Sequence, residues 1–276
     1  MNNPLVSICI PAYKCEKTIE KAVNSALSQT YKNIEIIIID DNSPDNTFKI
    51  LESIKDDRVH LYKNEHNLGM CDNWNKCVSY ANGEYIHFLH CDDILLPDSV
   101  NEKIDAVNKH NDVALVFSAT EIINKSDNVL MVRRYKNKDT IVNGLKICYE
   151  SLHKRNLFGE PSNVLFKKEI FEKVGGFCNE LKYVIDWDLW IRIAAFGNVC
   201  YINKVLSKYR ISNTNVTSSL LIKEMLEDDA KMVRNLQNSN FLHLSLHQNI
   251  IHRLVFRARA IIRYFYMKFW ANKLNN

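Results

Sequence analysis

Three features that would place the protein in a specialised class are missing from its sequence. The 276 residues include eight cysteines, but none form a C-x-x-C pair and no histidines stand at a spacing suited to zinc. No run of about eighteen apolar residues is present, so we expect no membrane-spanning helix. The opening MNNPLVSICIPAYK has no basic region followed by an apolar stretch, which argues against a signal peptide. We therefore expect a cytosolic globular protein whose cysteines are free thiols.

Acidic residues are absent from the last part of the chain. No Asp or Glu follows Asp229, so this tail carries +8 against a net charge of +4, and the preceding residues carry −4. From Ile251 to Phe269, apolar residues recur at three- and four-residue steps, with arginines on the other side of the same helix. Residues 245–276 are therefore expected to meet an anionic membrane surface or to pack on their own domain with a solvated basic face. No nucleic-acid-binding motif is present, so no nucleic-acid partner is expected.

Strands and helices alternate along the first 120 residues, which predicts βαβ units and a mainly parallel sheet flanked by helices. Residues 121–140 are polar and basic, which favours a loop or hairpin. The section 141–215 is less regular, and 218–275 is expected to be mostly helical. The predicted strands are near 5–10, 34–40, 58–63, 84–90, 113–118 and 199–209, and the predicted helices near 16–29, 45–55, 70–81, 98–110 and 186–196.

Two acidic pairs follow two strongly apolar predicted strands. Asp40-Asp41 follows the run NIEIIII, and Asp92-Asp93 follows GEYIHFLHC. An apolar residue at every position predicts a strand buried on both faces, and open α/β sheets bind ligands above the carboxyl ends of such strands. Neighbouring carboxylates repel unless a cation or a donor-rich ligand is present, so we expect a nucleotide carried with a divalent metal. Capping of the following helices is the alternative, but it gives no reason for acidic doublets at two strand ends.

An ordered set of short motifs resembles the family 2 glycosyltransferases of the GT-A fold. In chain order these are VSICIPAYK, SALSQTY, IIIIDDNS, NLG, ANGEYIHFLHCDD, GGF and IDWDLW. The resemblance implies a Rossmann-like GT-A domain over 1–215, with a nucleotide-binding half (about 1–120) and an acceptor-binding half (about 121–215). A basic amphipathic helical extension follows over 216–276. The family implies inverting transfer from a nucleotide-sugar by a single displacement, usually with Mg²⁺ or Mn²⁺.

The same resemblance assigns donor contacts near the first two strands. The loop Pro11-Ala12-Tyr13 is expected to hold a uracil by backbone contact and aromatic stacking. Asp41 aligns with the carboxylate that accepts the uracil imide N–H, while Asp40 is expected to orient the loop. A core tyrosine after a strand-ending proline is the alternative interpretation of Tyr13.

The second acidic pair matches the D-x-D-type motif of the family. By the match, Asp92 reaches the nucleoside and Asp93 ligates the metal. A hard divalent ion prefers carboxylate, phosphate and water oxygens, so one or two protein ligands suffice. Many relatives carry a third Asp where this chain has His90, which we interpret as a strand residue rather than a ligand.

The stretch IDWDLW carries the expected catalytic base. In-line displacement needs a carboxylate that removes the proton of the acceptor hydroxyl, and the resemblance places this role on Asp186. The family commonly has Glu-Asp here, but Ile185 replaces the Glu. Asp188 is the rival base. The other alternative is that both carboxylates act only as helix caps. Trp187 and Trp190 are candidate stacking surfaces for an acceptor sugar.

These observations predict addition of one sugar, from a UDP-hexose or UDP-N-acetylhexosamine, to a saccharide acceptor. A processive enzyme is not expected, because the Q-x-x-R-W signature is absent. The composition, rich in Asn, Lys and Ile, suggests a bacterial source, and the resemblance then implies surface polysaccharide synthesis on a lipid-linked acceptor at the inner face of the plasma membrane. The alternatives are a nucleotidyltransferase, which normally has a Gly-rich loop that IPAYKCEKT lacks, and a non-catalytic membrane-surface adaptor.

Overall fold

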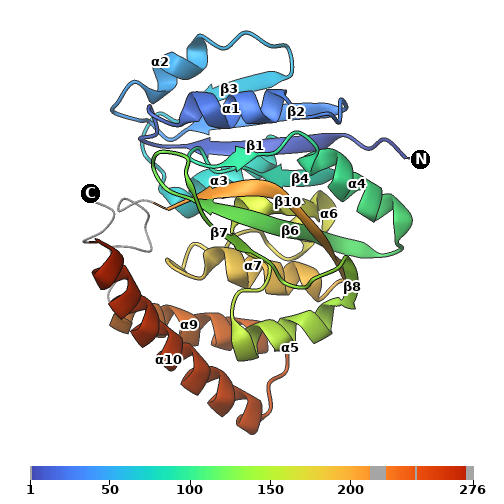
Figure 1. Ribbon diagram of the computed structural model, residues 1–276, viewed down its shortest axis with the longest axis vertical. Coiled ribbons are helices and arrows are strands. Elements are labelled where there is room, and N and C mark those ends of the chain that lie inside the picture. The colour runs from blue at the N-terminus through green and yellow to red at the C-terminus, as the bar shows by residue number, and fades with distance from the viewer. Residues whose placement is uncertain (1, 212–221, 240, 272–276) are drawn as a thin grey trace.

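Helices cover both faces of one large sheet, and the last two helices lie together at one end of the molecule (Figure 1). The computed structural model describes residues 2–211, 222–239 and 241–271, with side chains of the last helix described up to residue 262. None of the helices in these ranges is both long and apolar enough to cross a bilayer. All eight cysteines fall in these ranges and are free thiols, as predicted.

The sheet has ten strands within the described residues and is mixed. Its strands are β1 (Val6–Ala12), β2 (Ile34–Asp40), β3 (Val59–Lys63), β4 (Tyr85–Phe88), β5 (Ile94–Leu95), β6 (Val113–Ile123), β7 (Val129–Arg133), β8 (Thr140–Asn143), β9 (Val164–Lys167) and β10 (Asn198–Arg210). The order is β3-β2-β1-β4-β9-β6-β10-β5, with β7 beside β6 and β8 beside β10. The strands from β3 to β4 are parallel, as are β6 and β10, whereas β9 runs antiparallel between β4 and β6.

Alternate residues of the central strands enter two different hydrophobic cores. Ile36 and Ile38 of β2 belong to the core under one set of helices, and Ile37 and Ile39 to the core under the other set. The first set is α1 (Ile19–Leu27), α2 (Thr47–Glu52) and α4 (Ser99–Lys109); the second is α3 (Met70–Ser79), α5 (Gly144–Lys154), α6 (Lys168–Lys173) and α7 (Ile185–Ala194), backed by α9 (Ile222–Asn238) and α10 (Leu246–Ala271). The prediction of a strand buried on both faces is therefore confirmed.

The α/β fold with flanking helices and a helical C-terminal extension is confirmed. The alternating elements of the first 120 residues form as predicted, and the segment 121–140 contains the hairpin of β6 with β7. Sequence analysis did not predict α5, α6, β8 or β9. The strand β9 is the most consequential of these, because it joins β4 to β6 and so extends the first half of the sheet into the second.

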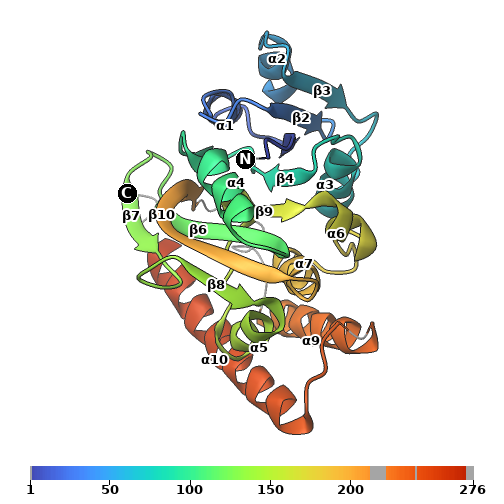
Figure 2. The ribbon, with the colours of Figure 1, turned by 90° about the vertical axis from the view of Figure 1, so that its right-hand side faces the viewer.

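The most buried side of α10 is not the apolar stripe expected from the sequence. Phe256 and Ala260 are buried against the domain, where α10 packs on α9 and α5 (Figure 2). Leu254 and Ile262 point outward and are 62 % and 66 % exposed. The part of the predicted stripe that includes Phe269 lies beyond the described side chains. Within the described side chains, the outward side of α10 therefore carries exposed apolar groups.

Candidate active site

A cavity of about 1450 Å³ runs along the carboxyl ends of β1, β2 and β4 and reaches the C-terminal helices. Its wall includes Tyr13 and Asp41 after the first two strands, Asp92 after β4, Asp186 on α7 and Phe256 on α10. Strand ends of this kind are the usual ligand-binding edge of an α/β sheet. The structure thus brings the predicted donor residues and the predicted base into one continuous space.

The end of β1 combines a buried backbone with one exposed aromatic ring. Pro11 and Ala12 are buried, so a ligand in the cavity meets mainly their backbone atoms. Tyr13 is 42 % exposed, and the ammonium group of Lys14 lies 5.0 Å from the centre of its ring. An exposed ring at a cavity wall can stack on a flat base, so the predicted uracil contact is geometrically open to Tyr13.

The two carboxylates after β2 have different surroundings. Asp40 is fully buried and accepts a hydrogen bond from the Ser43 backbone N–H at 3.0 Å, in agreement with its expected loop-orienting role. Asp41 accepts hydrogen bonds from the backbone N–H groups of Leu68 at 2.8 Å and Gly69 at 3.0 Å. Asn64 donates a further hydrogen bond to Asp41 at 2.8 Å. These three donors hold Asp41 at the cavity wall.

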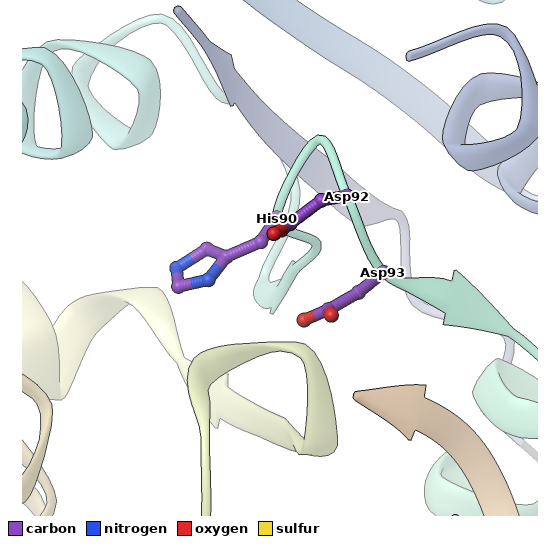
Figure 3. A group of neighbouring side chains, drawn as sticks. All are labelled: His90, Asp92 and Asp93. Carbon is purple, nitrogen blue, oxygen red and sulfur yellow. The ribbon is translucent and has the colours of Figure 1, made fainter. Parts of the chain in front are cut away.

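The second acidic pair lies in the turn after β4, together with His90 (Figure 3). The potential ligand atoms of His90, Asp92 and Asp93 lie within 4.8 Å of one another. Asp93 is 1 % exposed, and its two oxygens accept hydrogen bonds from the Ser162 hydroxyl at 2.5 Å and the Arg210 backbone N–H at 2.9 Å. Asp92 lines the cavity, whereas Asp93 lies behind it. Two carboxylates this close fit a hard divalent ion, and Asp92 is the one that faces the space a ligand would occupy.

Asp186 begins α7 at the cavity wall. Its carboxylate accepts hydrogen bonds from the Trp187 backbone N–H at 2.7 Å and from Asn156 Nδ2 at 3.3 Å. Burial, with a further contribution from the charge of Glu160, raises the pKa of Asp186 to about 7. A carboxylate with this pKa accepts a proton far more readily than an ordinary aspartate at neutral pH.

The rival base, Asp188, is directed away from the cavity. It is 1 % exposed and forms a buried ion pair with Arg192, whose Nε lies 2.8 Å from Asp188 Oδ2. Arg192 also donates a hydrogen bond to the Val174 carbonyl at 2.8 Å. The geometry therefore favours Asp186 over Asp188 as the group that can reach a ligand.

The two tryptophans of α7 do not offer open stacking faces. Trp190 is fully buried, and its indole N–H donates a hydrogen bond to the Gly159 carbonyl at 3.2 Å, so its expected role as a sugar platform is wrong in this structure. Trp187 borders the cavity but is only 5 % exposed. Its ring stacks on Phe256 of α10, and its indole N–H donates to Ser151 at 2.7 Å. Packing of α7 in the hydrophobic core therefore explains why tryptophan stands at both positions.

Comparison with known proteins shows which family this chain belongs to. The sequence model of glycosyl transferase family 2 matches residues 7–175, more than half of the chain. The chain belongs to glycosyltransferase family 2. The glycosyltransferase is also 33 % identical over 222 residues to the Escherichia coli UDP-Glc:alpha-D-GlcNAc-diphosphoundecaprenol beta-1,3-glucosyltransferase WfgD, covering 79 % of this chain and 82 % of that protein.

Two solved structures share the fold of this glycosyltransferase. Staphylococcus aureus TarS 1–349 in complex with UDP-GlcNAc superposes with a TM-score of 0.71 at 18 % identity, covering 91 % of this chain and 71 % of that one. The mannosyltransferase PcManGT from Pyrobaculum calidifontis, in complex with GDP-Man and Mn²⁺, has a TM-score of 0.66 at 15 % identity, covering 97 % and 74 %. Identities this low establish the shared fold alone.

Three polar residues of the glycosyltransferase's cavity region were not found from the sequence. Arg133 of β7 forms a bidentate ion pair with Glu160, and both line the cavity. Burial would raise the pKa of Glu160, but Arg133 outweighs it and holds that pKa below its ordinary value. Ser162 donates to Asp93 and accepts a hydrogen bond from the His90 backbone N–H at 2.9 Å. No local pattern marks these residues, because β7 and the turn before β9 meet only in the fold.

Two adjacent acids of α9 tie the C-terminal helices of the glycosyltransferase to its site. Asp228 accepts hydrogen bonds from the backbone N–H groups of residues 182–184, which immediately precede α7, at distances from 2.6 to 3.1 Å. Asp229 contacts Nε2 of His252 on α10 at 3.0 Å, and Nδ1 of His252 lies 2.8 Å from the Leu152 carbonyl of α5. These contacts fix the loop before Asp186 and the α10 wall relative to one another.

Proposed function

We propose that this glycosyltransferase transfers one sugar from a UDP-sugar to a saccharide acceptor with inversion at the anomeric carbon. The observation that carries the proposal is the continuous cavity between the Tyr13–Asp41 end and Asp186. A donor in the first region would present its anomeric carbon towards an acceptor hydroxyl held at Asp186. One carboxylate with a pKa of about 7 supports single displacement, because a base is needed only on the acceptor side.

In this mechanism, the chain positions two substrates and one proton. Tyr13 would stack on the base, and Asp41 would accept the imide N–H through the lone pairs left beside its protein donors. Asp186 would take the proton of the attacking hydroxyl. The Arg133–Glu160 pair supports this role, since the charge of Glu160 contributes to the raised pKa of Asp186 while Arg133 limits the rise.

We further propose that the turn after β4 holds Mg²⁺ or Mn²⁺. Asp92 would be the ligand within the cavity, with Asp93 behind it as the second acidic group. When bound, the ion would neutralise charge that builds on the departing diphosphate. The Mn²⁺ of the PcManGT complex supports this choice of ion by analogy of fold. The earlier assignment of the metal to Asp93 alone is thereby weakened by the hydrogen bonds that already engage both of its oxygens.

The acceptor is proposed to be a lipid-linked saccharide of a bacterial surface polysaccharide, used at the inner face of the plasma membrane. The name of WfgD, whose acceptor is a diphosphoundecaprenol-linked sugar, supports this class. The outward face of α10 supports the location, because Leu254 and Ile261 are 62 % and 47 % exposed and stand beside the exposed Arg253 and Arg257. Apolar and basic groups on one face suit an anionic bilayer surface.

A screen of UDP-sugars with the purified full chain tests the central proposal. We expect release of UDP that requires Mg²⁺ or Mn²⁺ and increases when a lipid-linked saccharide is added. The anomeric configuration of the product, determined by NMR, should be inverted. Retained configuration would contradict single displacement, and absence of transfer with every donor would favour the adaptor alternative.

Vesicle flotation tests the membrane proposal separately. The variant Arg253→Glu/Arg257→Glu should lose binding to vesicles that contain acidic lipid, since each basic group near such a surface contributes about 1 kcal/mol. Its rate of UDP-sugar hydrolysis should be unchanged, because neither residue lines the cavity. Lys223→Glu/Arg234→Glu, at two exposed residues of α9, provides the matched charge control. Equal flotation of all three proteins would contradict a docking role for α10.

A further inference from the structure

We infer that the end of the cavity beyond Asp186 binds the diphosphate of the acceptor through Arg155 and Arg259. This inference rests on the proposed lipid-linked acceptor and assigns the part of the site that recognises it. The residues come from different elements: Arg155 follows α5, and Arg259 is on α10. Neither residue belongs to the donor half of the chain.

Arg155 and Arg259 both line the cavity, and both also line a smaller pocket beside Glu150. Glu150 is paired with Lys154, and among the residues that the structure describes neither arginine forms a salt bridge. Burial and then the nearby charge of Arg155 lower the pKa of Arg259, so the two like charges are close enough to repel. Lys182 adds a third basic side chain to this wall. Like charges held together by separate helices are relieved by a bound anion, and arginine pairs bind phosphate oxygens in a bidentate manner.

This basic site adjoins the proposed base. Arg155 is followed by Asn156, whose side chain donates to Asp186 at 3.3 Å. Lys182 stands in the loop that Asp228 fixes in front of α7. A diphosphate at the arginines would therefore place its attached sugar beside Asp186, with a hydroxyl in reach of the carboxylate.

The wall around the basic site also carries apolar side chains, one of them largely exposed. Val255, Phe256 and Ala260 of α10 continue the cavity wall, and Ile262 both lines the cavity and is 66 % exposed. The cavity lining thus combines a carboxylate, arginines and hydrocarbon surface. A saccharide diphosphate ester of a long-chain alcohol offers a matching group to each of the three, which commits the site to that ligand rather than to free phosphate.

Equilibrium binding of farnesyl diphosphate tests this assignment without knowledge of the acceptor sugar. The measurement uses the full chain with saturating UDP and Mg²⁺, so that the donor region is occupied. We expect Arg155→Ala and Arg259→Ala each to weaken binding roughly tenfold and the double variant about a hundredfold. Loss of one hydrogen bond to a charged group lowers affinity by about tenfold. Farnesol should bind all variants alike. Inorganic diphosphate should compete with farnesyl diphosphate in the wild-type protein.

The control is Arg234→Ala, which removes an exposed arginine of α9 that does not line the cavity. Its affinity for farnesyl diphosphate should equal that of the wild type. The assignment is overturned if the double variant binds farnesyl diphosphate normally, if UDP abolishes binding in the wild type, or if the double variant also loses UDP. Normal UDP-sugar hydrolysis alongside a negative result would leave the proposed glycosyl transfer standing and reject only the diphosphate site.

Discussion

Replacement of Asp186 by asparagine tests two properties of this carboxylate: its ability to accept a proton, and the loss of stability caused by burying its charge. The pKa of Asp186 rises from an ordinary 3.8 to about 7, so its charged form is disfavoured in the folded protein. Each pKa unit corresponds to about 1.4 kcal/mol, and contact with solvent in the cavity reduces the full value, so we expect about 1–3 kcal/mol. The native state holds this proton more tightly than the unfolded chain. Wild-type stability therefore falls as pH rises from the unfolded pKa through the folded one.

Two measurements test the effect of this raised pKa. Urea unfolding should show Asp186→Asn to be more stable than the wild type by about 1–3 kcal/mol near pH 8, with little difference near pH 4. The kcat for sugar transfer should fall by about two to four orders of magnitude in the variant, because asparagine cannot accept the proton. Wild-type kcat should itself rise with pH through about 7. A variant with near-normal kcat, or a wild-type rate that declines over this range, would refute Asp186 as the base.

Asp188→Asn is the matched control on the same helix. Removal of one partner of the buried Asp188–Arg192 pair should destabilise the fold by about 3–5 kcal/mol. In the fraction that remains folded, the dependence of kcat on pH should keep its midpoint. Loss of that pH dependence together with kcat would mean that Asp188, rather than Asp186, contributes the titrating carboxylate.

Three further outcomes are expected. Asp92→Asn should weaken Mn²⁺-dependent binding of UDP in calorimetry more than Asp93→Asn does, because Asp92 faces the cavity; the reverse order would return the metal to Asp93. The loss of unfolding free energy in Asp229→Asn should be largest just below about pH 6.5. It should shrink as pH rises through the raised pKa of His252, and shrink again at low pH as Asp229, whose pKa burial raises, is protonated; a constant difference would contradict an ionic contact. Gly144→Ala should lower stability by about 1–3 kcal/mol or more in thermal unfolding, because a Cβ there would lie 1.7 Å from the Ala194 carbonyl oxygen; an unchanged melting temperature would show that the helices can separate.

The donor half of the fold was predictable because its signals are local. Ile36 to Ile39 of β2 form a continuous apolar run, and the burial of this strand on both faces matches that pattern. Carboxylates directly after such strands had to meet at one edge of the sheet, which located Asp41 and Asp92. The strand β9 was missed since four residues, VLFK, gain their place only by pairing with β4 and β6 across the sheet.

The acceptor side resisted prediction for a different physical reason. Arg133 and Glu160 are far apart in sequence, and nothing in either neighbourhood indicates a buried ion pair. Tryptophan is a residue type that often stacks on sugars, yet Trp190 is fully buried in the hydrophobic core. The apolar residues of α10 follow one period, but packing on α5 and α9 covers Phe256 and leaves Leu254 exposed. The sequence period predicts a helix, but it does not predict which side of that helix packs on neighbouring elements.

The neighbouring carboxylates of α9 have a mechanical consequence. Successive residues of an α-helix point about 100° apart, so Asp228 reaches the loop before α7 while Asp229 reaches His252 on α10. A rotation of α9 about its own axis that shortened one contact would lengthen the other. The helix therefore has one rotational setting that satisfies both, and this setting fixes the spacing between Asp186 and α10, where we propose that the acceptor binds. Insertion of a single residue in α9 ahead of Asp228 would turn both carboxylates away together, and acceptor use would be lost before the donor region was disturbed.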